Sequence, residues 1–337
     1  MRASGFVAFA SALLASVACG DRSSDAVSSS GSSGTEPPAS SSGTSGSAGT
    51  SGSSGTSGSS GSSGGTDGGS SGSSGGTDGG SDAGPDGGGG GRDYSANKAA
   101  FFGASRCAGA GLTLCDDFES GTLDKTTWSV VGTAPVIDGL QHARGTKALH
   151  ITMNGNGASY IKETKTFPAA KNTYWGRVFV WFDALPVAPM TYSHWTFGAA
   201  TGTGVQGEIR LSGQLQNGAN HFGVGTDSGQ SATGTGDWTS SDKDPANAPL
   251  AVPTKQWVCI EWLHKGDTNE TKFYWDAVEH ASLATTTTKH GGNANPFILP
   301  QFTAMWVGWQ EYQPSTEKFE MWLDEVAVDA TRIGCIL

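Results

Sequence analysis

Short runs of alternating apolar and polar residues recur along the chain beyond residue 92. The runs that show this alternation, or that are dense in β-branched and aromatic residues, are 147–153, 160–167, 174–185, 194–200, 207–215, 257–266, 271–278 and two closing runs within 302–335. Gly, Pro, Asn and Asp separate them, and no long segment has the period of an amphipathic helix. The pattern predicts an all-β domain in which two antiparallel sheets pack as a sandwich or jelly roll. A hairpin is expected where Gly266 to Thr268 separate two of the runs.

The first closing run has two different faces. Met305, Val307 and Trp309 share one side of the expected strand, which indicates a core face. The other side carries a mixed set of small, aromatic and amide side chains, namely Ala304, Trp306, Gln310 and Tyr312. Because ligand sites combine apolar rings with a few polar groups, we interpret this side as a ligand surface.

A carboxylate falls among apolar residues in the second closing run. Asp324 alternates with Trp322, Val326 and Val328, so the pattern predicts that all four side chains point the same way. A buried carboxylate must be paired or bound to a cation. A salt bridge or a capped turn is the alternative to a metal site.

The run 207–215 presents one polar face. Its polar residues, Glu208, Arg210, Ser212 and Gln214, alternate with apolar residues and glycine. Arg and Gln can grip sugar hydroxyls and carboxylates, and aromatic rings pack against the apolar faces of sugars. The alternative is an ordinary solvated outer strand. His194 is a further candidate for catalysis, with a surface or internally hydrogen-bonded histidine as the alternative.

Composition divides the chain into three parts. Residues 1–19 have an early Arg, an apolar run and small residues before Cys19, which is the layout of an export signal. The cysteine resembles a bacterial lipoprotein cleavage site, which predicts a lipid anchor on Cys19, with an ordinary cleaved signal as the alternative. Residues 20–92 are mostly Ser, Gly and Thr and are expected to form a disordered tether. Residues 93–337 hold nearly all of the aromatic residues and form the expected globular domain.

Charge narrows the range of partners. The formal net charge of −11 argues against a nucleic acid, because neutralising phosphates requires clustered Lys and Arg. It fits a domain outside the cytoplasm, either anchored at a bacterial cell surface or outer membrane or secreted. We expect the protein to be a monomer.

The cysteines predict two disulfides. Setting aside Cys19 leaves Cys107, Cys115, Cys259 and Cys335, an even number in an exported chain. Three pairings are possible, and the short spacing favours Cys107 with Cys115 and Cys259 with Cys335. A zinc site is the alternative, although the chain has no CxxC pair or His/Cys cluster.

Five segments, taken in order, resemble one protein family. They are CDDFESGTLDKTTW at 115–128, EIRLSGQ at 208–214, WVCIEW at 257–262, VGWQEY at 307–312 and WLDEVAVDATRIGC at 322–335. Together they resemble the core domain of the cellulose-induced fungal secreted protein family and its bacterial relatives. The resemblance spans about Leu114 to Cys335. It implies a concanavalin-like β-jelly roll related to glucuronan lyases and alginate lyases, with a lectin-like concave face and a structural calcium ion.

The resemblance also assigns residues. It places Arg210, Gln214 and Tyr312 in the binding cleft, and Glu119 and Asp324 at calcium-ligand positions. Main-chain carbonyl groups around residues 144–147 are expected as further ligands, because calcium prefers oxygen. Such an ion would hold the start of the domain to its end.

A β-elimination of uronic acid polymers can be written on these residues. It needs a base for the C5 proton, an acid for the leaving oxygen and a group that neutralises the carboxylate. We assign Tyr312 as acid and base, His194 as assisting base, and Arg210 with Gln214 or Gln310 as the carboxylate clamp. Trp306, Gln310 and Tyr312 are expected to form a wall that faces the residues of the run 207–215.

One position departs from the family. Its fungal members carry a histidine two positions before the arginine, where this chain has Glu208. A carboxylate there would repel a uronate unless Arg210 pairs with it first.

Two other functions are kept as alternatives. A non-catalytic, lectin-like module would use the same residues to bind a polysaccharide without chemistry. A glycoside hydrolase ranks third, because Glu208 is a cleft candidate but Glu261 shares its side with Trp257 and Cys259. A long loop is expected at 237–248, at the edge of the groove.

Overall fold

The computed structural model describes residues 92–187, 189–190, 192–204, 207–227, 237–240, 250–290 and 296–337. The expected signal segment with Cys19, nearly all of the expected tether and most of the expected loop 237–248 lie outside these residues.

The strands of the described residues form two antiparallel sheets. The first sheet has the order β13-β12-β11-β6-β15-β4-β3, and β1 also pairs with β15. Its strands are β1 (Leu114–Asp116), β3 (Val136–Asp138), β4 (Ala148–Asn154), β6 (Thr173–Ala184), β11 (Trp257–Lys265), β12 (Glu270–Trp275), β13 (Val278–Glu279) and β15 (Lys318–Asp329). The expected hairpin is present, because β11 pairs directly with β12.

The second sheet has the order β10-β9-β8-β7-β14-β5-β2. Its strands are β2 (Trp128–Gly132), β5 (Gly157–Glu163), β7 (Tyr192–Thr203), β8 (Glu208–Gln216), β9 (Ala219–Asp227), β10 (Asp237–Ser240) and β14 (Gln301–Glu311). Three short 3-10 helices, η1 (Lys98–Ala100), η2 (Ala170–Asn172) and η4 (Ala281–Leu283), lie in the connections of the described part of the chain. None of the helices in that part is long and apolar enough to cross a bilayer.

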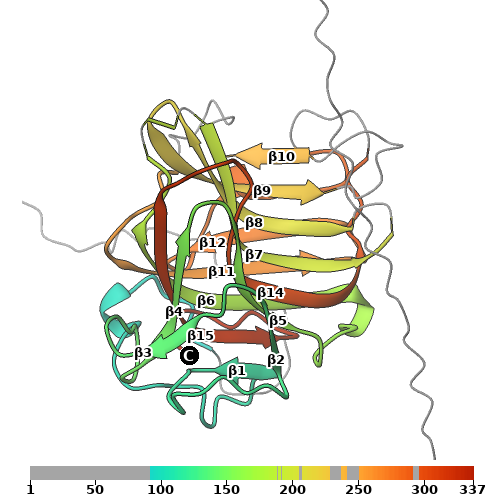
Figure 1. The fold of residues 1–337 in the computed structure, drawn as a ribbon. Coiled ribbons are helices and arrows are strands. Elements are labelled where there is room, and N and C mark those ends of the chain that lie inside the picture. The colour runs from blue at the N-terminus through green and yellow to red at the C-terminus, as the bar shows by residue number, and fades with distance from the viewer. Residues whose placement is uncertain are drawn as a thin grey trace, which may run out of the picture. The chain divides into compact units, whose positions relative to one another are not determined.

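The two sheets pack face to face (Figure 1), with β7 to β10 drawn in front of β6, β11 and β12. A large apolar core fills the space between them. Val178, Phe182 and Ile260 contribute from the first sheet, and Phe197 and Leu211 from the second. The described residues therefore form an all-β sandwich of two antiparallel sheets, as the alternation predicted, and the concanavalin-like jelly roll that the resemblance implied has this architecture.

The faces of the first closing run are as predicted. Met305, Val307 and Trp309 belong to the core between the sheets, whereas Trp306 is buried outside it. The strand period of two is therefore enough to separate the two sides of this strand.

The prediction for the second closing run is wrong in one respect. Asp324 does not share a face with Val326 and Val328, because β15 has an irregularity between its pairings at Asp324 and Ala327. Two residues, Glu325 and Val326, oppose a single residue of β6 there, and Glu325 has φ +44°. Such a bulge moves the following residues to the other face. Val326 and Val328 therefore enter the core, while Asp324 faces outward.

Both predicted disulfides form. Cys107 pairs with Cys115, and Cys259 pairs with Cys335. The second bond fastens the C-terminal segment to the middle of β11. Two disulfides fit an oxidising compartment outside the cytoplasm.

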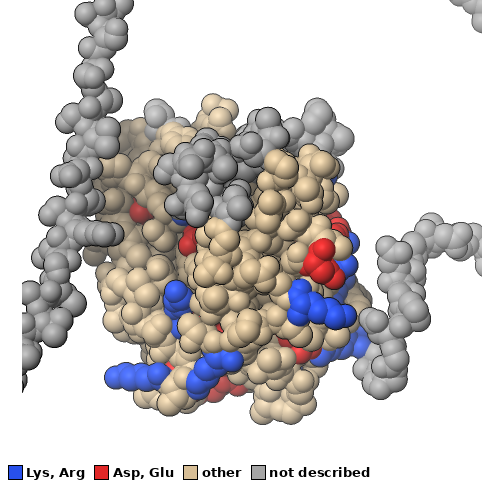
Figure 2. Space-filling model, turned by 90° about the vertical axis from the view of Figure 1, so that its right-hand side faces the viewer, with Lys and Arg blue, Asp and Glu red and all other residues tan. Residues whose placement is uncertain are grey.

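Surface charge is scattered on the face that Figure 2 shows. Uncharged residues cover most of it, and Lys and Arg gather toward its lower part. The net charge of −11 is therefore not concentrated as an acidic patch on this side.

Candidate functional site

Polar side chains gather on the outer face of the second sheet, away from the core. Strand register brings them into rows, because directly opposed residues project to the same face. The rows are Lys162, Trp306, Ala199 and Arg210; Gln310, Thr196 and Ser212; and His194, Gln214 and His221. We call these residues, together with Glu208, Tyr160 and Tyr312, the polar face.

Tyr312, which directly follows β14, contacts two of the predicted catalytic residues. Its ring stacks on the His194 imidazole, with centroids 4.4 Å apart and planes 8° from parallel. The central carbon of the Arg210 guanidinium lies 4.7 Å from the centroid of the same ring. Tyr312, His194 and Arg210 are all half-buried. The structure therefore brings the three residues into one cluster, although they come from three different strand regions.

Two buried hydroxyl groups lie next to the Tyr312 hydroxyl. Thr196 Oγ1 is 3.3 Å from the Tyr312 phenol oxygen and 3.0 Å from Ser212 Oγ. Thr196 and Ser212 are both fully buried. Because hydroxyl groups both donate and accept hydrogen bonds, the Thr196 and Ser212 hydroxyl groups can orient the Tyr312 phenol hydrogen.

Gln313 holds His194 in place. Gln313 Oε1 accepts the His194 backbone N–H at 2.6 Å, which leaves the amide nitrogen on the other side. That nitrogen lies 2.9 Å from His194 Nδ1 and must donate to it. The neutral imidazole therefore carries its proton on Nε2. Sequence reasoning missed this role, because Gln313 lies beyond the strand pattern.

Glu311 lies behind this cluster, on the core side of the sheet. Its Oε1 accepts hydrogen bonds from Ser193 Oγ at 2.6 Å and from the Gln313 N–H at 3.2 Å. No described residue partners its Oε2. Burial raises the pKa of Glu311 to about 7, although these two donors act in the opposite direction. Its carboxyl is therefore largely protonated below neutral pH.

Glu208 and Arg210 form the ion pair on which an acidic substrate depends. Arg210 Nε donates to Glu208 Oε1 at 2.6 Å. The pair removes much of the repulsion that a free Glu208 would exert on a uronate, but it also neutralises part of the Arg210 charge. Glu208 is thus a modulator of charge next to Tyr312.

Trp306 is on the predicted face but is covered. Its exposed fraction is only 2%, because the Tyr160 ring stacks on it with centroids 4.3 Å apart. Gly308 permits this approach, since a Cβ at that position would lie 2.4 Å from Tyr160 Cα. Tyr160 is half-exposed, and partial burial and the Glu208 charge raise its pKa. Tyr160, which sequence reasoning missed, therefore presents the accessible ring.

The predicted wall and its partner are neighbours in one sheet. β7 lies between β14 and β8, so Trp306 and Gln310 lie beside the β8 residues and do not face them. Gln214 donates its amide N–H to Gln216 and is 9% exposed. Gln310 is half-buried and directly opposes Thr196.

Glu261 lies far from the polar face in the fold. It is fully buried in β11, in the first sheet, where Arg332 Nη2 donates to it at 3.0 Å and the Gly334 N–H at 2.7 Å. It therefore cannot pair with Glu208 across a substrate, as a two-carboxylate glycosidase would require.

The two predicted calcium ligands contact one short segment, residues 143–147. Asp324 Oδ2 accepts the N–H groups of Ala143 and Arg144 at 2.8 and 2.9 Å. Glu119 Oε1 accepts those of Thr146 and Lys147 at 2.7 and 2.8 Å. The segment thus offers N–H groups to the two carboxylates, whereas carbonyl groups were expected to serve the ion.

The oxygen atoms of these carboxylates retain room for a cation. Asp324 Oδ1 accepts one hydrogen bond, from the Glu325 N–H, and Glu119 Oε2 accepts one, from Thr146 Oγ1. The chemistry of the two groups suits a hard cation such as Ca²⁺. No group of three or more His, Cys, Asp or Glu side chains suitable for a metal occurs among the residues that the structure describes. Calcium therefore stays a prediction that needs further oxygen ligands.

Burial makes the Asp324 carboxyl easier to protonate than an ordinary aspartate. Burial raises the pKa of Asp324 to about 7, against the effect of its three N–H donors. The opposite holds at Glu119: partial burial acts upward, but the donors from Thr146 and Lys147 lower its pKa.

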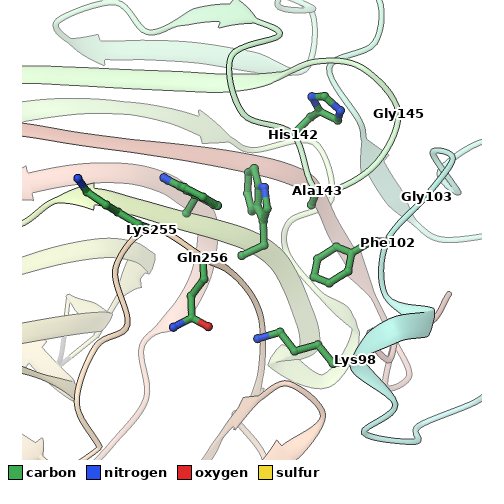
Figure 3. Close-up of a pocket in the computed structure, with 10 residues that line it drawn as sticks. Lys98, Phe102, Gly103, His142, Ala143, Gly145, Lys255 and Gln256 are labelled. Carbon is green, nitrogen blue, oxygen red and sulfur yellow. The ribbon is translucent and has the colours of Figure 1, made fainter.

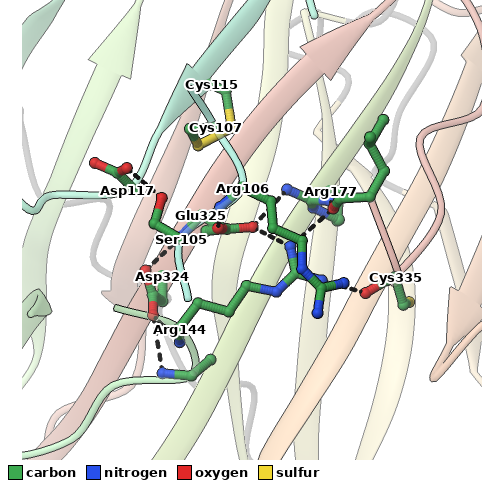
Figure 4. A network of polar contacts seen from close by, with 12 residues as sticks. Ser105, Arg106, Cys107, Cys115, Asp117, Arg144, Arg177, Asp324, Glu325 and Cys335 are labelled. Atoms are coloured by element: carbon green, nitrogen blue, oxygen red, sulfur yellow. Dashed lines mark hydrogen bonds and ion pairs between the residues drawn. A yellow bond between two sulfur atoms is a disulfide. The ribbon is translucent and has the colours of Figure 1, made fainter. Parts of the chain in front are cut away.

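A buried ionic network adjoins Asp324 (Figure 4), and sequence reasoning missed it. Glu325 is fully buried and accepts hydrogen bonds from the Arg144 and Arg177 guanidinium groups, the latter at 3.0 Å. The Arg106 N–H donates to its other oxygen at 2.6 Å. Arg144 also donates to Cys335 O at 2.6 Å. The network therefore joins the first residues of the domain to its last strand.

Fold and polar face together define a class: a concanavalin-like jelly roll with an outer sheet face rich in hydrogen-bonding and aromatic groups. No protein-family model matches the chain, and no curated protein matches it.

Solved structures share the fold. The structure is similar to that of "Cellulose induced protein, Cip1", with a TM-score of 0.50 at 18% identity over 66% of this chain and 99% of that chain. It also matches the alginate lyase AlyC3, with a TM-score of 0.38 at 13% identity over 54% of this chain and 74% of that chain. A third match is the CBM22-1 xylan-binding domain of Paenibacillus barcinonensis Xyn10C, with a TM-score of 0.31 at 14% identity over 66% and 95% of the two chains. At this identity, the similarity to Cip1 shows the fold alone.

Proposed function

We propose that the polar face binds an acidic polysaccharide and cleaves it by β-elimination. The observation that supports this is the cluster of Tyr312, His194 and Arg210, in which an imidazole and a guanidinium both lie against the ring of one phenol. These are the three kinds of group that the reaction needs: a proton acceptor and donor, an assisting base and a cation for the carboxylate.

The proposed reaction assigns each group one task. Tyr312, as phenolate, takes the C5 proton, and the released electron pair forms the C4–C5 double bond while the C4–O bond breaks. The phenol then returns the proton to the leaving oxygen. His194 assists the proton transfer, and Arg210 with Gln214 or Gln310 holds the uronate carboxylate. The guanidinium above the Tyr312 ring favours negative charge on the phenolate.

Lys162 and Tyr160 support binding of the polymer next to this cluster. Lys162 opposes Trp306 in register, so a second cation lies on the polar face. The half-exposed Tyr160 ring offers a surface for the apolar face of a sugar. We propose that Tyr160 binds the unit next to the one whose bond is cleaved.

The location follows as part of the same proposal. A lipid on Cys19 would hold the domain at a bacterial cell surface, and residues 20–92 would let it reach a polymer. A secreted form with a cleaved signal is the alternative.

The test is a panel of polymers. The full chain is incubated with glucuronan, alginate and cellulose, and two signals are followed: ultraviolet absorbance of unsaturated product, and retention on insoluble polymer. We expect absorbance with at least one uronate and none with cellulose. Retention on cellulose without absorbance on any uronate would overturn elimination and leave a binding module, which is the second candidate.

A further inference from the structure

A second site lies on the opposite side of the sandwich. Trp181 and Trp257 oppose each other in β6 and β11. Their neighbours Val180 and Val258 enter the core between the sheets, so the two indoles project to the outer face of the first sheet. They line a cavity of about 600 Å³, which is in the size range of small-ligand sites (Figure 3).

Aromatic rings form much of the lining of this cavity. The Trp181 and Trp257 rings have centroids 6.0 Å apart and planes 60° from parallel. Trp257 is 8% exposed, whereas Trp181 and Phe102 are half-buried. Figure 3 shows Phe102 at one end of the cavity and Lys255 at the other. Rings in this arrangement can pack against the C–H face of a sugar.

The charged groups of the lining are cations, in a chain whose net charge is −11. Lys98 lies 2.8 Å from Asp276, a carboxylate that also accepts the Cys259 N–H. Lys255 is exposed and forms no ion pair with the residues that the structure describes. Its backbone is fixed, because its N–H donates to Phe182 O at 2.8 Å in a left-handed conformation with φ +55°. His142, also exposed, adds an imidazole at the rim.

Two acidic groups near the cavity have other partners. Asp276 holds Lys98, and Asp183 accepts the Trp181 Nε1–H at 3.3 Å. Lys255 forms no ion pair with either carboxylate, so its ammonium can meet an external anion. The neutral Gln256 amide in the lining adds hydrogen bonds suited to sugar hydroxyls.

We propose that this cavity binds a sugar residue that bears a carboxylate, with the ring on Trp181 and the carboxylate on Lys255. The site lies on the sheet that does not carry Tyr312, so it takes no part in elimination. It gives the domain a second binding site for an acidic polysaccharide. This site does not depend on the reaction proposed for the polar face.

The experiment measures binding of a glucuronate tetrasaccharide by calorimetry. It uses the full chain carrying Tyr312→Phe, so that ligand is not consumed if elimination occurs. The tetrasaccharide can bind at the cavity and at the polar face. We expect Lys255→Gln to weaken its affinity for the cavity about tenfold, the effect of losing one charge-assisted contact. Lys255→Arg should bind as before, and Lys265→Gln, at the half-buried lysine that ends β11, is the control. A glucose tetrasaccharide should bind more weakly than the glucuronate one.

A second readout locates the site. In a ¹H–¹⁵N NMR spectrum, the Trp181 indole N–H resonance should shift when the glucuronate tetrasaccharide is added. The resonance is assigned by its loss in Trp181→Phe. Three results would overturn the proposal. Lys255→Gln could leave the affinity for the glucuronate tetrasaccharide unchanged at both the cavity and the polar face. The glucose tetrasaccharide could bind as tightly as the glucuronate one, or the Trp181 signal could stay where it is. Absence of elimination by the wild-type chain would refute the reaction alone, because the binding assay does not require it.

Discussion

Glu208 controls how much positive charge Arg210 can offer a substrate. The two side chains are on the same face of β8, two positions apart, and their polar atoms are 2.6 Å apart. A substrate carboxylate must therefore compete with an internal one for the same guanidinium. The effect of either residue on an acidic substrate therefore depends on the other residue and cannot be inferred from its own charge alone.

Replacing Glu208 should improve binding of an acidic sugar. In Glu208→Gln the repulsion is removed and Arg210 keeps a neutral hydrogen-bond partner, so we expect affinity for a glucuronate oligosaccharide to rise about fivefold at low salt. Calorimetric titration measures it, and high salt should reduce the gain. Glu279→Gln, in the other sheet, is the control. Equal or weaker binding by Glu208→Gln would contradict the proposed role of the pair.

Glu311 should make stability fall as pH rises. Its pKa is about 7 in the folded chain and near its usual value of 4.5 when unfolded. Between these values the unfolded chain loses the proton while the folded chain keeps it, so its contribution is complete below pH 4.5 and is lost as pH rises through about 7. The loss is on the order of 3 kcal/mol, since the two pKa values differ by about 2.5 and each pKa unit corresponds to about 1.4 kcal/mol.

The comparison uses Glu311→Gln, which cannot titrate. Denaturant unfolding of both proteins at pH 5 and pH 8 should show a steeper loss for the wild type. The difference between the proteins is needed because buried His264 acts in the opposite sense: burial lowers its pKa to about 3, and its contribution is lost as pH falls. Parallel pH profiles of wild type and Glu311→Gln would show that Glu311 does not titrate as described.

Local alternation could predict only part of the candidate site. It located Arg210, Gln214, Trp306 and Gln310 on outward faces, because each depends on strand period alone. Gln313 and Tyr160 could not be found in this way. Their roles depend on which strands pair and on the close approach of β5 to Gly308, and neither is a property of one segment.

At the scale of elements, the bulge in β15 has the largest consequences. It turns Asp324 outward and leaves Glu325, with φ +44°, fully buried beside Arg144 and Arg177. The charges compensate one another inside the protein, where an unpaired charge is costly. The bulge thus creates the site where the ends of the domain meet.

Removing one charge from this network should destabilise the fold strongly. Glu325→Gln keeps the size of the side chain but leaves two buried guanidinium groups without their carboxylate, so we expect a loss of about 3 kcal/mol in the free energy of unfolding. Glu270→Gln, which breaks a partly exposed pair with Lys272, should cost less than about 1 kcal/mol. Similar unfolding midpoints for both variants would show that the buried network contributes little.

Strands were predictable from sequence where they are long and aromatic. The runs that became β6, β11 and β14 carry dense apolar patterns. β9, with the sequence ANHFGVGTD, has only two large apolar residues and five weak strand formers, and it was missed. It forms because β8 and β10 pair with it on both sides. Such strands are defined by their neighbours, which a single segment does not reveal.

At the scale of the whole molecule, the two sheets present different outer surfaces. The second sheet carries the polar face with Tyr312, and the first carries the Trp181 cavity and the buried charges. The fold class and both disulfides followed from the alternation and the cysteine spacing, since those signals are local. Which surface each sheet carries could not be predicted in this way, because it depends on the order in which the strands pair.

The predicted calcium ion also belongs to this scale, because it would join Glu119 near the start of the domain to Asp324 near its end. Calcium should raise the melting temperature of the full chain and a chelator should lower it, since a ligand that binds only the folded state stabilises it. Asp324→Asn should abolish the calcium response. A melting temperature that is the same with calcium and with chelator would contradict the ion and leave hydrogen bonds alone at these carboxylates.

The central claim is that the Tyr312 hydroxyl moves the proton in an elimination reaction. The most direct measurement compares unsaturated product formed from glucuronan by the wild type, Tyr312→Phe and Tyr94→Phe, a tyrosine at the far surface whose ring packs on Arg332. We predict that Tyr312→Phe loses at least about a hundredfold in rate while still binding the polymer, and that Tyr94→Phe keeps the wild-type rate. Wild-type activity in Tyr312→Phe would contradict the account.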